Sequence, residues 1–94
     1  MPKVRSQDYV MRAPIVMMCP ICHKVHAIGI REAVASTKYK GEDLQYNEIY
    51  SFCDNVTPRF AEFMSQEQHR ENQRRLEKAY QIKVKKDREA RFHG

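Results

Sequence analysis

The sequence predicts an α+β fold, in which a small antiparallel β-hairpin sheet is followed by one long C-terminal helix. Residues 44–53 alternate with period two after a turn signal at Lys40-Gly41-Glu42, so we expect residues 33–53 to form a hairpin. Residues 66–90 contain no Gly or Pro, which permits an unbroken helix. We therefore divide the chain into an arm (1–13), a β domain (14–64), a C-terminal helix (65–90) and a tail (91–94).

The composition predicts one soluble domain with a small core. The chain has 94 residues, of which 41% are hydrophobic and 31% charged, and it has no Trp. A core of this size is commonly supported by a metal, a partner or oligomerisation. We find neither a signal peptide nor an apolar run of the ~20 residues needed to span a bilayer. The three cysteines, an odd number, favour a reducing cytoplasm over a secreted disulfide scaffold.

The strands are predicted from β-branched and alternating segments. The run APIVMM (13–18) predicts a strand that ends at CPIC. The segment HAIGIREAVAS (26–36) fits a helix or a twisted strand, and Gly29, which weakens a helix by about 1 kcal/mol, favours the strand. Gly41 is expected to supply a positive φ at the hairpin turn. In the second hairpin strand one face carries Leu44, Tyr46, Glu48, Tyr50 and Phe52.

The helix has a recognisable start and a thin apolar stripe. A loop over 54–58 is expected to end strand pairing at Thr57-Pro58. Ser65 is a candidate N-cap, and Gln68 completes a capping box. We expect the end beyond Val84 to fray, because few apolar residues could hold it. At helical spacing the stripe consists of Leu76, Ala79, Tyr80 and Val84.

The cysteines predict a metal site. Cys19 and Cys22 lie on one tight turn, and a hairpin would return Cys53 to them. Zinc prefers four tetrahedral N or S ligands, so one imidazole, from His23 or His26, would complete a set of three thiolates. In a regular two-knuckle ribbon the fourth ligand would stand at Val56, which cannot bind metal. We predict a zinc-ribbon-like structural site; a metal-free ribbon with buried cysteines is the alternative.

These motifs resemble the zinc-binding N-terminal domain of the MqsA/YgiT-type antitoxins. The resemblance covers roughly residues 15–82 and is carried by CPIC, the hairpin TKYKGEDLQY, YSFC and the helix EQHRENQRRLEKAYQ. In that family a CPxC knuckle and a CxxC knuckle hold one zinc. This sequence departs from the pattern at Val56, and it has His23 where Gly often follows the first knuckle.

The resemblance implies a binding protein that contacts a toxin. The family usually carries a helix-turn-helix domain after this module, whereas this sequence ends at Gly94. The part present here would then be the toxin-contacting half. We expect a non-enzymatic, antitoxin-like or inhibitor-like protein that sterically covers a bacterial or phage-related partner protein.

The C-terminal quarter suggests a second function, nucleic-acid binding. From His69 to His93 there are nine basic and four acidic residues, so all of the net charge of +5 lies there. A solvated helix face is the simpler interpretation. The hairpin tyrosines could stack bases or anchor a protein, although core packing is the commoner role. The candidate binding residues are Tyr39, Tyr46, Tyr50, Arg70, Arg74, Arg75, Lys78 and Lys83.

A thiol-disulfide oxidoreductase is the third alternative. CPIC could supply a low-pKa thiolate at Cys19 if a helix followed it. The βαβ context that supports such a motif is not predicted here. No spaced acid–base pair, Gly-rich phosphate loop or metalloprotease motif occurs, so we expect no enzyme. The sequence is also compatible with a homo-oligomer.

Overall fold

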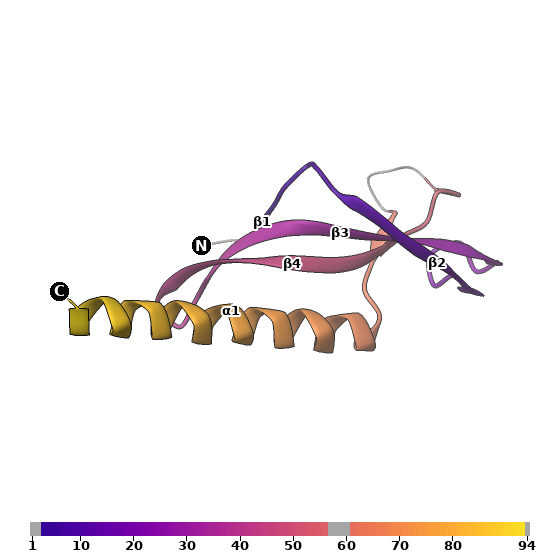
Figure 1. Ribbon diagram of the computed structural model, residues 1–94. Helices are drawn as coiled ribbons and strands as arrows, with labels where there is room; N and C mark the ends of the chain where they lie inside the picture. Colours follow the sequence, from indigo (N-terminus) through magenta and orange to yellow (C-terminus); the bar gives the residue numbers. More distant parts are fainter. Residues whose placement is uncertain (1–2, 57–60, 94) are drawn as a thin grey trace.

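The computed structural model describes residues 3–56 and 61–93 and confirms the α+β class. A five-stranded antiparallel sheet is accompanied by one long C-terminal helix (Figure 1). The predicted end of strand pairing at Thr57 and Pro58 lies outside the described residues. The elements are β1 (Val4–Arg5), β2 (Val10–Met18), β3 (Val25–Tyr39), β4 (Glu42–Phe52), β5 (Glu62–Phe63) and α1 (Gln66–His93).

Strand β3 is the centre of the sheet. One of its edges pairs with β4 along 11 positions, and the other pairs first with β2 and then with β1. Strand β5 pairs with the end of β4. The segment 26–36 is therefore a strand, as Gly29 indicated. Strand β1 and the first four residues of β2 fall within the expected arm 1–13, so part of that arm belongs to the sheet.

The β3–β4 hairpin closes at Lys40 and Gly41, the first two of the three predicted turn residues, and Glu42 already belongs to β4. Lys40 and Gly41 both have positive φ, at 49° and 81°, and the flanking residues Tyr39 and Glu42 are paired. Two central residues of positive φ give a type I′ turn, whose twist matches that of the flanking strands. The glycine is required here because an L side chain is strained in this conformation.

Helix α1 lies along the outer edge of β4 (Figure 1). The side chain of Asn72 donates to the carbonyl of Ile49 at 2.9 Å and accepts from its N–H at 2.8 Å. Further along, Arg75 and Lys83 donate to the carbonyls of Asn47 (2.8 Å) and Asp43 (3.1 Å). The edge groups that have no strand partner are thus satisfied by side chains of the helix.

The start of α1 confirms the capping box. The Ser65 hydroxyl accepts from the N–H of Gln68 at 3.1 Å, and the Gln68 side chain accepts from the N–H of Ser65 at 2.9 Å. The helix then extends to His93. Fraying beyond Val84 was expected and is not found, because no Gly or Pro interrupts the segment.

The buried side chains form two groups. An apolar cluster surrounds the cysteines and contains Ile28 and Ile30. A polar group surrounds Glu48, which is fully buried and accepts from Lys3, Arg5 and Tyr46. The molecule is elongated, with extents of 57 × 21 × 20 Å. Within the described part of the chain, we find no helix apolar and long enough to cross a membrane.

Candidate metal centre

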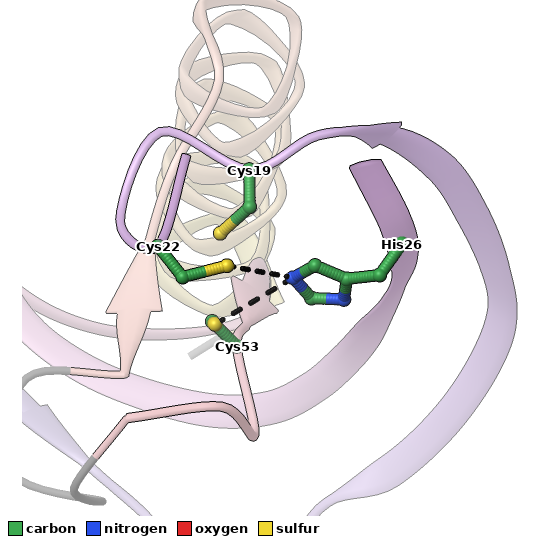
Figure 2. A group of neighbouring side chains, drawn as sticks. All are labelled: Cys19, Cys22, His26 and Cys53. Carbon is green, nitrogen blue, oxygen red and sulfur yellow. Dashed lines mark hydrogen bonds between the residues drawn. The ribbon is translucent and has the colours of Figure 1, made fainter. Parts of the chain in front are cut away.

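Three elements bring four ligand-bearing side chains together. Cys19 follows β2, Cys22 lies in the β2–β3 turn, His26 is the second residue of β3, and Cys53 follows β4. Their ligand atoms all lie within 4.8 Å of one another. Figure 2 shows the four side chains pointing toward a common centre. This cluster could hold a metal ion.

The spacing of the ligand atoms suits a tetrahedral ion. The Nε2 atom of His26 lies 3.3 Å from Sγ of Cys22 and 3.7 Å from Sγ of Cys53. Around a tetrahedral zinc, with Zn–S of about 2.3 Å and Zn–N of about 2.0 Å, neighbouring ligand atoms are roughly 3.5–3.8 Å apart. The two separations from Nε2 are thus close to that geometry, and no pair of ligand atoms is more than 4.8 Å apart.

His26 supplies the imidazole, and its ring is oriented by the backbone. The Nδ1 atom lies 2.9 Å from the carbonyl oxygen of Ala27, to which it can donate, and this leaves Nε2 facing the sulfurs. Such a second hydrogen bond is usual for a metal-binding histidine. His23, the other candidate, is exposed and is not part of the cluster; it has a φ of 61° in the turn.

The CPIC turn is held by its own backbone. The N–H of Cys19 donates to the carbonyl of Lys24 and the N–H of His23 to the carbonyl of Cys19, both at 2.9 Å. The N–H of Ile21 points at Sγ of Cys19, 3.4 Å away. Donors aimed at sulfur favour the thiolate, which is the form that binds metal.

The thiols differ in acidity. Burial raises the pKa of Cys19, but N–H groups of Cys22 and Ile21, with His26 and Cys53, outweigh it and lower the pKa to about 6. Burial also raises the pKa of Cys22, yet hydrogen bonds, led by that from Asn55, bring it below its usual value. Burial and the neighbouring thiols raise the pKa of Cys53. The cluster therefore readily forms its first thiolate at Cys19.

The site is closed. Cys19 and Cys53 are fully buried, and Val56, the residue at the expected fourth-ligand position, packs against the core beside them. Asn55 approaches Sγ of Cys22 with its side-chain amide, at 3.7 Å. Sequence reasoning missed this contact, for which the only signal was an amide two residues after Cys53. Four protein ligands leave no open position for a reacting water.

The predicted hairpin tyrosines make internal contacts. Tyr50 is 3% exposed, and its ring lies under the Arg5 guanidinium at 3.9 Å. The hydroxyl of Tyr46 donates to Glu48 at 2.8 Å. Tyr39 packs edge-on against Tyr80. Tyr50 is therefore a core residue, whereas Tyr39 and Tyr46 are half-buried.

The predicted cationic residues separate into two groups. Arg75 and Lys83 face β4 and satisfy its edge, as described above. Arg70, Arg74 and Lys78 are exposed. Among the described residues, this second group forms no hydrogen bond to the sheet.

No known family, curated protein or solved structure matches this chain. The resemblance to the MqsA/YgiT-type antitoxins therefore remains a prediction.

Proposed function

We propose that this protein is a small non-enzymatic binding module whose sheet is held together by a structural zinc ion. The observation that supports this most directly is the closed cluster of Cys19, Cys22, His26 and Cys53. Sulfur and imidazole ligands at tetrahedral spacing favour zinc over hard cations, which prefer oxygen. A closed set of protein ligands serves folding rather than catalysis.

The oxidoreductase alternative receives less support. The CPIC turn joins two antiparallel strands, and β3, not a helix, follows it. Cys19, which would be the attacking thiolate, is fully buried. A redox dithiol needs an exposed thiolate near a helix N-terminus or another positive centre.

Metal analysis of the purified protein tests the zinc site. We expect one zinc per chain and, after exchange with cobalt, the absorption of a tetrahedral site with three sulfur ligands. Cys53→Ser and His26→Ala should each lower zinc affinity by at least tenfold, because each removes a ligand. His23→Ala, at the residue directly after the last CPIC cysteine, is the matched control and should bind zinc as the wild type does. Metal-free protein that is fully folded would contradict the proposal.

For the partner, we favour an acidic protein surface, in line with the antitoxin-like or inhibitor-like expectation. Five exposed cations lie on the side of α1 opposite its β4 contacts, within about 80° of arc and along about 27 Å of helix. We name this group the basic ridge: Arg70, Arg74, Lys78, Lys85 and Arg88. Such a ridge accelerates association with a negatively charged partner and adds specificity.

Nucleic acid is the second candidate for the same ridge. Its long line of cations can contact successive phosphates, whereas the tyrosines that could have stacked bases already contact other side chains of the protein. Backbone contact of this kind predicts duplex binding without sequence preference and with a steep dependence on salt.

A binding assay with duplex DNA and duplex RNA separates the two candidates. If nucleic acid is the partner, a variant with Arg70, Arg74 and Lys78 changed to Gln should bind at least tenfold more weakly and show a shallower salt slope. Lys38→Gln, an exposed cation on β3, is the matched control. Absence of binding at low salt removes nucleic acid and leaves the protein partner, which pull-down with the same variants then tests.

A further inference from the structure

Strand β2 carries an unusual number of exposed apolar side chains. Val10, Met11, Ile15, Val16 and Met18 are exposed by 57%, 57%, 54%, 71% and 64%. Val25, at the start of the neighbouring strand, is 64% exposed. Isolated exposed apolar residues are ordinary, but a contiguous group on one strand marks an interaction surface.

The outer edge of β2 is also open. In an antiparallel pair, hydrogen-bonded and non-hydrogen-bonded positions alternate. The N–H of Cys19 donates to the carbonyl of Lys24, so the main-chain groups of Met17 and Ile15 point toward β3, and those of Val16 and Met18 point outward. Within residues 3–56 and 61–93, no strand pairs with this edge. The opposite edge of the sheet, by contrast, is covered by α1 and β5.

Only half of this edge is protected against pairing with another strand. Proteins protect edges with charges, prolines and bulges. The first half of β2 has all three, in Arg12, Pro14 and the register shift between Arg12 and Ile15. The second half, residues 15–18, has none, although it is the most apolar part of the strand.

We infer that residues 16–18 of β2 pair antiparallel with the same residues of a second copy of this chain, about a twofold axis at Met17. Val16 would then oppose Met18 of the second copy, and each pair would exchange two main-chain hydrogen bonds. Pro14 and Pro20 are each three residues from Met17. Pro14 of one copy would therefore lie opposite Pro20 of the second copy, and the pairing would end at the same place on both sides.

The side chains support self-pairing rather than capture of an unrelated strand. Val16 and Met18 lie on the same face of the sheet as Val25 and Ala27, since they are register partners. A twofold axis at Met17 places this apolar group next to its own copy, as an isologous interface requires. Residues 15–18 carry no charge that would be repelled by the second copy. The two sheets would become one.

Analytical ultracentrifugation from about 1 to 500 µM tests the inference. A short paired edge with a small apolar group should give a dimer with Kd on the order of micromolar. The variant with Val16→Lys and Met18→Lys should remain monomeric over this range, because it places four lysines at the interface. Ile82→Lys, a comparable change at an exposed apolar residue of α1, should dimerise as the wild type does. Zinc content and far-UV circular dichroism show that each variant is folded.

Amide hydrogen exchange locates the interface. The amides of Val16 and Met18 should gain protection with protein concentration, whereas those of Ile15 and Met17, bonded to β3, should be protected at all concentrations. A folded protein that is monomeric at 500 µM, or a dimer that survives the double lysine substitution, would overturn the inference. So would protection of the Val16 and Met18 amides that appears only when another protein is added, which would show that the edge takes a foreign strand.

Discussion

At the scale of single residues, Glu48 shows how the sheet tolerates a buried charge. It lies on the aromatic face of β4, where the alternation pattern predicts an apolar residue. Arg5 and Lys3, contributed from the N-terminal segment, form ion pairs with its carboxylate, and Tyr46 donates to it. Burial raises the pKa of Glu48, but the hydrogen bonds from Lys3, Arg5 and Tyr46 outweigh burial and leave the pKa below its usual value.

We expect Glu48→Gln to lower the free energy of unfolding by about 2–3 kcal/mol at pH 7, because Lys3 loses its counter-charge and Arg5 keeps only Glu62. A carboxyl group with a lowered pKa in the fold contributes stability above its unfolded pKa and loses it as pH falls through the folded value. Urea unfolding of both proteins should therefore show a constant difference from pH 7 to about pH 5, which shrinks below about pH 4.5. A difference that does not change with pH would contradict this assignment.

His23 should be replaceable by glycine. Its φ of 61° places a β-carbon in the left-handed region, which costs an L residue roughly 1 kcal/mol. His23→Gly should therefore be more stable than His23→Ala by about that amount in thermal unfolding, and both should keep one zinc. Equal stability of the two variants would mean that this turn does not carry the strain.

The metal ligands show how far single residues could be predicted. The return of Cys53 to the CPIC pair followed from the hairpin pattern, and the cluster confirms it. The choice between His23 and His26 could not be made from spacing. It depends on the reversal of direction within the turn, which leaves His23 exposed and brings His26 back on β3 to face the sulfurs.

At the scale of elements, helix α1 matches the repeat of the strand beside it. Gln68, Asn72, Arg75 and Lys83 contact residues 51, 49, 47 and 43 of β4 in that order. One helical turn rises about 5.4 Å and two strand residues about 6.6 Å, so antiparallel elements stay nearly in step over these positions. The helix occupies the place of a further strand.

Asn72 should be the most sensitive residue of this contact. Asn72→Ala leaves both main-chain groups of Ile49 without a partner at a nearly buried position, and we expect a loss of about 2–3 kcal/mol in unfolding free energy. Asn72→Asp can accept but not donate, so its unfolding free energy should be below that of the wild type. Gln81→Ala, on the exposed side of α1, is the control and should change stability by less than about 0.5 kcal/mol.

The polar nature of this contact explains what the sequence did not predict about α1. Its start and its thin apolar stripe were evident, but the few apolar residues led us to expect that the end beyond Val84 would fray. The face that docks is largely polar, because it binds the edge of a strand rather than the side chains of a sheet. Hydrophobic periodicity carries no signal for such a contact.

At the scale of the whole molecule, the metal cluster lies at one end of an elongated structure. The β2–β3 turn and the start of α1 are at that end, and the β3–β4 turn is toward the other (Figure 1). The radius of gyration of 16.4 Å exceeds the roughly 12 Å expected of a compact domain of this length. An apolar cluster with Ile28 and Ile30 surrounds the cysteines, so the ion would hold this part of the core together.

Removal of the metal should therefore unfold the metal end first. We expect a strong chelator to abolish amide protection of β2 and of the β4–β5 pair, whereas the β3–β4 hairpin near Gly41 and its contacts with α1 lose less. Hydrogen exchange read by mass spectrometry, before and after chelation and after zinc is restored, measures this. Uniform loss along the chain would show a single cooperative unit.

The length of the molecule has a consequence for how substitutions combine. Its long axis of 57 Å separates the surroundings of Cys22 from those of the Tyr39–Tyr80 pair by much more than direct contact. Sites that share no partners usually contribute independently to stability. The changes in unfolding free energy caused by a ligand substitution at one end and by truncation of an aromatic side chain at the other should therefore add. Each end can then be altered without a compensating change at the other.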